Sequence, residues 1–142
     1  MPHRIAIASD HAAFAMKAEL ADWLRERGHE VLDLGTEGTE SVDYPDYGYR
    51  IGEAIADGRA RFGVALCGSG VGISIAANRN PAVRCALVSE PVSARLARNH
   101  NDANVLALGA RNDRHRNGQG VRDDLPQRGI RRRPPPAPRG QA

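Results

Sequence analysis

Long hydrophobic runs and cysteines are both scarce in this chain of 142 residues. No window approaches the roughly 18 consecutive apolar residues that a membrane-spanning helix needs. The first residues also lack the long apolar stretch and the small-residue cleavage site of a secretory signal. The two cysteines, Cys67 and Cys85, are too few for a disulfide framework. We therefore expect a soluble cytoplasmic protein that does not associate with a membrane.

Sequence patterns for metal and nucleotide binding are absent as well. The chain has no H-E-x-x-H or C-x-x-C pair, which are spacings typical of metal ligands. Its glycine-rich segment reads CGSGVG from Cys67 to Gly72. This segment has neither the G-x-G-x-x-G spacing of a dinucleotide loop nor the Lys-Ser/Thr of a Walker A loop. We expect no metal ion, no dinucleotide and no nucleotide held by a Walker A loop.

Excess positive charge is confined to the C-terminal end. Residues 1–111 carry 12 Lys and Arg against 14 Asp and Glu, whereas residues 112–142 carry 8 Arg against 3 Asp. The C-terminal stretch also holds five of the nine prolines and no aromatic residue, so it has too little apolar surface to offset its ordering entropy. We predict one domain over 1–111 and a disordered basic tail over 112–142. Because no aromatic side chains lie among the arginines, we do not expect nucleic-acid binding.

Short apolar runs alternate with helical patterns throughout residues 1–111. Such alternation is typical of βαβ units, in which helices cover both faces of a parallel sheet. Right-handed crossovers then predict an α/β fold: a Rossmann-like three-layer αβα domain with a five-stranded parallel sheet. The predicted strands are 4–8, 30–34, 62–67, 83–88 and 104–108, and the predicted helices are 12–27, a stretch after the turn at 43–49 that ends at 57, 72–78 and 91–100.

Chemically reactive residues follow two of these strands directly. Asp10 and His11 come after the first strand, and Cys67 ends the third strand just before the glycine-rich turn. Ligands of such sheets bind outside the carboxyl ends of the strands, and amides at a helix N-terminus attract anions. A thiol beside those amides is suited to act as a nucleophile or base, with a buried structural cysteine as an equal alternative. Cys85, inside a strand, is expected in the core, and His11 and His100 are each either functional residues or ordinary surface or core side chains.

Five segments stand out for their length and order. They read SDHAAF, DYPDYG, CGSGVGISIAANR, SEP and RNHNDANVLALGAR. Together they resemble the type B ribose-5-phosphate isomerases and the related galactose-6-phosphate and allose-6-phosphate isomerases, from about Ile5 to Arg111. The resemblance implies a Rossmann-like fold and a homodimer, with tetramers among some relatives, whose site spans the dimer interface. It also implies a cofactor-free aldose–ketose isomerisation of a sugar phosphate through a cis-enediolate.

The resemblance also assigns roles to individual residues. It makes Cys67 the base that removes the C2 proton, Ser69 a hydroxyl that moves protons between O1 and O2, and His100 the residue that opens the furanose ring. The backbone amides of the glycine turn would hold the charge of the enediolate. The implied substrate-binding residues are Asp10, His11, Tyr44, Gly68, Gly70, Val71, Gly72, Asn101 and Arg111, with His11 and Arg111 on the phosphate side.

The chain departs from this family after Arg111. The family continues there with an amphipathic helix and an arginine-bearing segment that binds the phosphate, whereas residues 112–142 show no such pattern. The tail can be back-translated with free choice of codons and then read one base later. The codons permitted in that frame include a long segment that resembles the family's C-terminal helix and arginine segment. We therefore hypothesise a frameshift near codon 112. The nucleotide sequence tests this hypothesis, because a single-base change must then restore a helical tail.

The resemblance predicts interconversion of ribose 5-phosphate and ribulose 5-phosphate, a step of the pentose phosphate pathway. A hexose-6-phosphate isomerase, acting on allose or galactose 6-phosphate, is an alternative that would use the same catalytic set. Two alternatives of another class are a non-catalytic module that binds a small ligand and a nucleic-acid-binding protein that relies on the basic tail. Turnover of ribose 5-phosphate against allose 6-phosphate separates the two enzymes.

Overall fold

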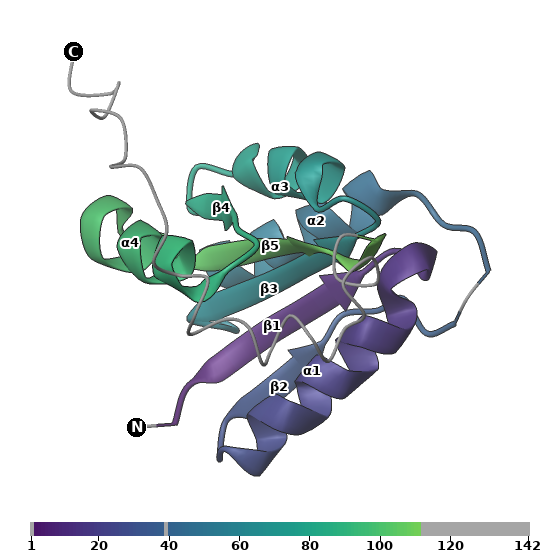
Figure 1. Cartoon of the computed structure of the whole chain (residues 1–142), viewed down its shortest axis with the longest axis horizontal. Helices are drawn as coiled ribbons and strands as arrows, with labels where there is room; N and C mark the ends of the chain where they lie inside the picture. The colour runs from purple at the N-terminus through teal and green to yellow at the C-terminus, as the bar shows by residue number, and fades with distance from the viewer. Residues whose placement is uncertain (1, 39, 112–142) are drawn as a thin grey trace.

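The computed structural model describes residues 2–38 and 40–111. The tail predicted for 112–142, with its frameshift hypothesis, lies outside these residues. Within the described part, no helix has the length and apolarity needed to cross a membrane. The elements in chain order (Figure 1) are β1 (Arg4–Ser9), the short 3₁₀ helix η1 (His11–Ala13), α1 (Phe14–Glu26), β2 (Glu30–Asp33), α2 (Tyr44–Ala56), β3 (Phe62–Cys67), α3 (Val71–Asn78), β4 (Cys85–Leu87), α4 (Pro91–Asn101) and β5 (Val105–Gly109).

All five strands pair in parallel in the order β2-β1-β3-β5-β4. The predicted five-stranded Rossmann-like α/β sheet is therefore confirmed. Strands β1, β3 and β5 consist mainly of small and branched apolar residues, most of them buried, as expected for strands covered by helices. Helices α2 and α3 pack on one face of the sheet, and α1 packs on the other (Figure 1).

Strand β4 is shorter than predicted, because the chain before it forms a turn, in which the N–H of Val83 donates to the carbonyl of Asn80 (2.9 Å). It spans only Cys85–Leu87, whereas the apolar run predicts 83–88. The Arg84 N–H donates to the side-chain oxygen of Asn104 (2.8 Å) instead of to a strand. The Asn78 side chain accepts from the N–H of Cys85 (2.8 Å) and donates to its carbonyl (2.9 Å), as a neighbouring strand would. The backbone N–H and carbonyl of Cys85, on the edge strand of the sheet, are thereby paired.

Two glycines bring helices α2 and α3 close together. A Cβ atom on Gly48 would lie 2.7 Å from the Cβ of Ala76, and one on Gly52 would lie 2.9 Å from the Cβ of Asn80. Glycine therefore permits a backbone approach that larger residues would prevent. Because α3 is held this close to α2, the turn that leads from β3 into α3 has a defined position at the edge of the sheet.

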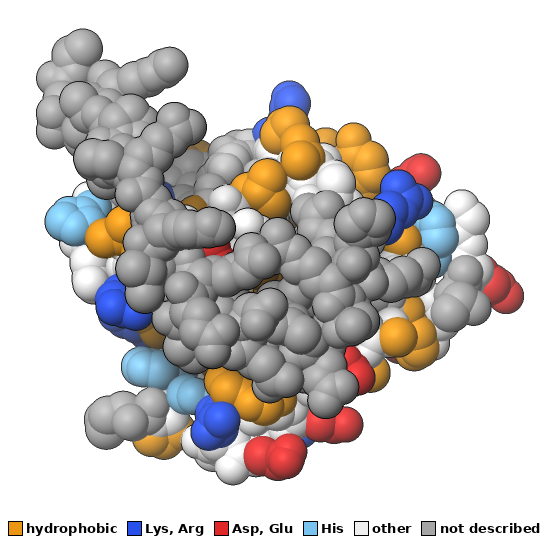
Figure 2. Space-filling view, in the orientation of Figure 1, with side chains coloured by type: hydrophobic (Ala, Val, Ile, Leu, Met, Phe, Trp, Pro, Cys, Tyr) orange, Lys and Arg blue, Asp and Glu red, His pale blue; other side chains and the backbone are white. Residues whose placement is uncertain are grey.

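Three large apolar side chains are exposed on α3 and beside it. Val71, Ile75 and Leu87 are 46%, 61% and 46% exposed, respectively. Figure 2 shows hydrophobic side chains gathered at the surface over α3. We call these three residues the α3–β4 patch. Because Val71 lies within the glycine turn, the patch borders the site described next.

Candidate active site

The carboxyl ends of β1 and β3 are neighbours at the point where the chain changes from one face of the sheet to the other. Strand β1 leads into α1 on one face, whereas β3 leads into α3 on the opposite face (Figure 1). In open parallel sheets such a switch leaves a crevice in which ligands bind. Asp10 and His11 follow β1, and the turn at 67–72 follows β3. The fold thus brings these two sequence-predicted groups to the same switch point at the carboxyl edge of the sheet.

Cys67 is the last residue of β3, and its sulfur is turned toward the glycine turn. The residue is only 4% exposed, and its Sγ accepts a hydrogen bond from the Gly70 N–H at 3.2 Å. An amide donor at this position can stabilise negative charge on the sulfur. The thiol is therefore both packed against the core and directed at the backbone that was predicted to bind the substrate.

Each glycine of the turn is required for a different physical reason. Gly70 has a φ of +82°, a left-handed backbone conformation that favours glycine. A Cβ on Gly68 would lie 3.0 Å from the guanidinium carbon of Arg111. A Cβ on Gly72 would lie 2.5 Å from the ring of Tyr44. The absence of these side chains therefore brings an arginine and a tyrosine against the backbone next to the thiol.

Replacement of Gly70 by alanine is expected to destabilise the protein more than the same change at Gly28. Both residues have positive φ, +82° and +89°, so both substitutions bear a backbone cost of about 1–2 kcal/mol. Only at Gly70 would the new Cβ also contact Leu87 Cδ1 (2.7 Å) and the Leu108 carbonyl carbon (2.9 Å), which adds about 1–3 kcal/mol. Urea unfolding of the two variants measures the difference. Equal losses in free energy of unfolding would contradict the tight packing of the turn.

Two of the amides predicted to hold the enediolate already have partners inside the turn. The Gly70 N–H donates to the sulfur, and the Val71 N–H donates to the Ser69 hydroxyl oxygen at 3.1 Å. Within this described turn, no atom accepts a hydrogen bond from the N–H groups of Gly68, Ser69 or Gly72. The Ser69 hydroxyl accepts one bond, so its own proton is available to another acceptor.

Asp10 and His11 are both held by backbone amides. The side chain of Asp10 is buried, and its Oδ1 accepts from the N–H groups of Ala12 (3.0 Å) and Ala13 (3.3 Å). It thereby caps the first turn of η1, a structural role that the sequence analysis did not identify. The Nδ1 atom of His11 accepts from the N–H of Val42 at 3.0 Å. Both side chains are therefore oriented before any ligand binds.

Tyr44 and Arg111 lie beside the glycine turn. Tyr44 begins α2 and packs its ring against Gly72, and the N–H of Arg111 donates to the carbonyl of Gly68 at 2.8 Å. Among residues 2–38 and 40–111, no three His, Cys, Asp or Glu side chains are arranged to hold a metal ion. Arg111 is thus a positively charged group close to the turn that carries the thiol.

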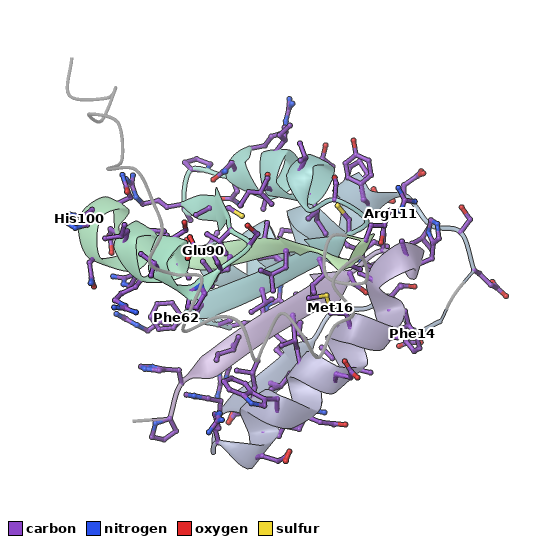
Figure 3. All side chains as sticks on the ribbon, viewed as in Figure 1. Phe14, Met16, Phe62, Glu90, His100 and Arg111 are labelled. Carbon is purple, nitrogen blue, oxygen red and sulfur yellow. The ribbon has the colours of Figure 1, made fainter. Side chains whose placement is uncertain are left out.

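His100 and Asn101 are not brought to this crevice within one chain. They end α4, which begins after the carboxyl end of β4 and returns to the amino end of β5. Figure 3 shows His100 and Arg111 at opposite ends of the molecule. The Asn101 carbonyl accepts from the Arg84 Nε at 2.7 Å, again at the amino end of the sheet. In one chain, these two residues therefore lie at the wrong end of the sheet to meet a substrate at Cys67.

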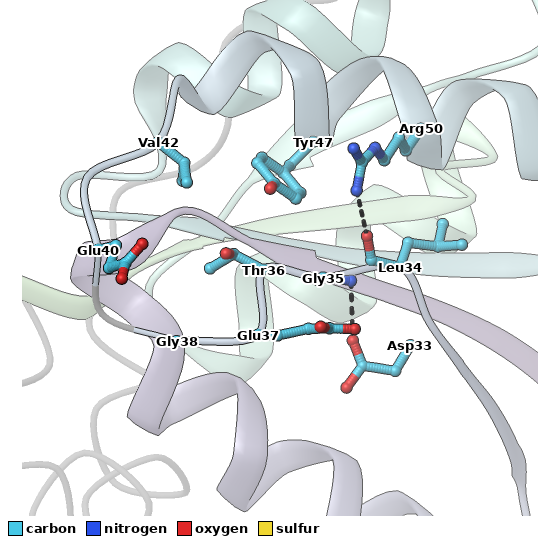
Figure 4. A pocket seen from close by; sticks show the side chains of 10 residues that line it. All are labelled: Asp33, Leu34, Gly35, Thr36, Glu37, Gly38, Glu40, Val42, Tyr47 and Arg50. Carbon is cyan, nitrogen blue, oxygen red and sulfur yellow. Dashed lines mark hydrogen bonds between the residues drawn. The ribbon is translucent and has the colours of Figure 1, made fainter.

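A separate pocket of about 700 Å³ lies between α2 and the loop that follows β2 (Figure 4). The Arg50 guanidinium packs over the Tyr47 ring at 4.5 Å and donates to the Leu34 carbonyl at 3.0 Å. No sequence pattern indicates this pocket, because it depends on the path of an irregular loop. It is lined by Asp33, Leu34, Gly35, Thr36, Glu37, Gly38, Glu40, Val42, Tyr47 and Arg50, none of which was predicted as a site residue.

Cys85 is only partly buried, although the sequence analysis expects it in the core. Burial nevertheless raises the pKa of its thiol from 9.0 to about 12. Above pH 9 the unfolded chain loses this proton while the folded chain keeps it, so the free energy of unfolding falls as the pH rises. We expect a loss of at most about 1.4 kcal/mol per pH unit up to about pH 12. Urea unfolding at several pH values above 9 should show that the free energy of unfolding falls less steeply with pH for Cys85→Ala than for the original protein. Identical dependence on pH in the two proteins would contradict the prediction.

Comparisons with known proteins agree with this geometry. The Ribose/Galactose Isomerase family profile matches residues 5–120. Ribose-5-phosphate isomerase B of Escherichia coli is 49% identical over 108 residues, which are 76% of this chain and 72% of that protein. The galactose-6-phosphate isomerase subunit LacB of Clostridium acetobutylicum is 41% identical over 107 residues, 75% of this chain and 62% of that one.

Solved structures give the same result. Ribose-5-phosphate isomerase B of Clostridium thermocellum superposes with a TM-score of 0.79 at 45% identity, covering 90% of this chain and 84% of that one. The corresponding enzyme of Thermotoga maritima has a TM-score of 0.78 at 47% identity, covering 87% and 85%. With a family profile that spans most of its length and relatives of this similarity, the chain belongs to the ribose/galactose isomerase family.

Proposed function

We propose that this protein interconverts ribose 5-phosphate and ribulose 5-phosphate. The observation that carries the proposal is the Cys67 thiol, which lies against the Gly70 amide at the switch point of the sheet. Family membership and the similarity to proteins named ribose-5-phosphate isomerase B support the choice of substrate. We place the enzyme in the cytoplasm, a reducing compartment in which two free cysteines are stable.

In the proposed reaction, the Cys67 thiolate removes the proton from C2 of the open-chain aldose. The electron pair of that C–H bond forms the C1=C2 double bond, and the carbonyl electrons move to O1. The amides of Gly68, Ser69 and Gly72 are suited to stabilise this oxyanion, because no partner within the turn occupies them. The Ser69 hydroxyl moves a proton between O2 and O1, and the thiol returns its proton to C1, which completes the ketose.

We propose that a second copy of the chain completes the site. His100 is assigned to ring opening, yet in the same chain it lies near the amino end of the sheet, whereas Cys67 lies at the carboxyl end of β3. Figure 3 shows His100 at the opposite end of the molecule from Arg111, which packs beside the turn that carries Cys67. The exposed α3–β4 patch borders the glycine turn, and such apolar surface favours association with another protein surface. A homodimer formed through this patch would set His100 and Asn101 of one copy beside the turn of the other.

Charge placed in the patch is expected to weaken the dimer. Ile75 is 61% exposed in the single chain, so Ile75→Glu should leave the fold intact while it introduces a carboxylate into the interface. We expect a rise in the dimer dissociation constant of about 30-fold or more, the effect of losing one strong interface contact. Analytical ultracentrifugation measures this constant.

Trp23→Glu is the control for this experiment, since Trp23 is 45% exposed on α1 and outside the patch. Equal weakening by both changes would contradict the proposed interface.

The choice of substrate is tested by steady-state kinetics with three sugar phosphates. We expect kcat/KM for ribose 5-phosphate to exceed that for allose 6-phosphate or galactose 6-phosphate by about tenfold or more, because a site shaped for a pentose disfavours the extra carbon. The reverse order would make the protein a hexose-6-phosphate isomerase. Absence of turnover on all three, with binding retained, would favour a non-catalytic binding protein.

A further inference from the structure

The hydrogen bond between His11 and Val42 determines which nitrogen of the imidazole carries the proton. The N–H of Val42 donates to His11 Nδ1 at 3.0 Å. Nδ1 must offer a lone pair to accept this bond, so it holds no proton. In a neutral imidazole the remaining proton is then on Nε2. The backbone thus selects one of the two tautomers of His11.

The donor belongs to a loop that is anchored around the end of β1. The Ser9 N–H donates to the Gly35 carbonyl (2.8 Å), and the Thr36 N–H donates to the Ser9 carbonyl (2.9 Å). Val42 lies at the other end of this loop, two residues before Tyr44 and the start of α2. The bond to His11 therefore joins the first residue of η1 to the segment that leads to Tyr44.

The other ring nitrogen of His11 is left for a ligand. His11 is half-buried at the crevice, and within the described residues its Nε2 makes no hydrogen bond. Among the described residues, no hydrogen bond joins Nε2 to the neighbouring carboxylate of Asp10, whose Oδ1 accepts from the amides of Ala12 and Ala13. An Nε2–H that is oriented and unpartnered in this way is a donor for an acceptor oxygen such as that of a phosphate.

We propose that the Val42 backbone amide is a positioning group that holds His11 as an Nε2–H donor to the phosphate of the bound sugar phosphate. This inference rests on the proposed function and adds to it the tautomer and the group that selects it. His11 then donates to the phosphate while neutral, and Val42 contributes to substrate affinity through His11 alone.

A double-mutant cycle tests the coupling. Val42→Pro removes the donor, and Ser41→Pro is the matched control, since it places the same residue in the same loop without touching this bond. His11→Gln provides a background that retains a donor near the Nε2 position but offers no acceptor near Nδ1.

We expect Val42→Pro to raise KM for ribose 5-phosphate about three- to tenfold, the effect of one neutral hydrogen bond, with little change in kcat. In the His11→Gln background the same change should alter KM by less than about twofold. Equal increases in both backgrounds would overturn the proposal.

His11→Asn keeps the proposal testable if the proline variants do not fold. Asparagine retains an acceptor near the Nδ1 position and loses the Nε2 donor, so the thermal midpoint should stay at the wild-type value while KM rises. Unchanged KM would show that His11 only holds the loop and would overturn the proposal.

Nitrogen-15 NMR of the histidine side chains reads the tautomer directly. We expect an unprotonated Nδ1 and a protonated Nε2 for His11 in the free protein, and a change at Nε2 when inorganic phosphate is added. A proton on Nδ1, or no response to phosphate, would overturn the inference. Because this measurement needs no turnover, its result is independent of whether the protein proves to be a ribose-5-phosphate isomerase.

Discussion

Replacement of Cys67 by alanine is expected to lower kcat for ribose 5-phosphate by about 10²–10⁴-fold, the usual contribution of a general base. The reason is that no other titratable group of the same chain lies in the turn at 67–72. The fold should persist, because alanine occupies the same buried position with less volume and loses only the hydrogen bond from Gly70. Coupled spectrophotometric assays of ribulose 5-phosphate formation measure the effect.

Two further variants separate a chemical role of the sulfur from a structural one. Cys67→Ser retains an acceptor for the Gly70 amide but replaces the thiol by a far less acidic hydroxyl, so it should be nearly as inactive as Cys67→Ala. Cys85→Ala removes the other thiol of the chain, which lies on the edge strand β4, and should leave kcat within about twofold of the original value. Full activity of Cys67→Ser would mean that the residue only holds the turn in place.

Mixed dimers of Cys67→Ala and His100→Ala are expected to regain activity that neither variant has alone. If each site combines the thiol of one chain with the imidazole of the other, a dimer with one copy of each variant holds one intact site and one doubly altered site. Random pairing makes half of the dimers mixed, so about a quarter of all sites should be intact. Co-expression of the two variants, followed by kinetic assay of the purified mixture, measures this fraction.

The matched control for this experiment pairs Cys67→Ala with Arg111→Ala. Arg111 packs against Gly68 in the same chain as Cys67, so both changes affect the same site and no arrangement of the two chains restores it. Recovery should therefore be absent. If the His100 mixture also fails to recover, although the dimer forms, the site does not span two chains.

Local sequence patterns were sufficient to predict the fold. The alternation of apolar runs with helical segments identified every strand, and β3 was predicted with its observed bounds of Phe62–Cys67. The pattern overestimated β4, because the apolar character of Val83 does not reveal that its N–H bonds the carbonyl of Asn80 in a turn, or that the Asn104 side chain accepts from the N–H of Arg84. The glycines of the turn marked a close backbone approach, although their individual neighbours, Arg111 and Tyr44, come from elsewhere in the chain.

The order of apolar and polar residues along the chain predicted the α/β fold and the position of Cys67 at a strand end, since both predictions follow from local patterns of the sequence. Only the structure showed the hydrogen bond from Val42 to His11, the contact of Tyr44 with Gly72 and the place of His100 near the amino end of the sheet, away from the carboxyl end of β3 where Cys67 lies. These features join residues separated by tens of positions. Such contacts depend on the path of the loops and on the direction in which each helix returns across the sheet, and no short-range preference of the chain encodes either.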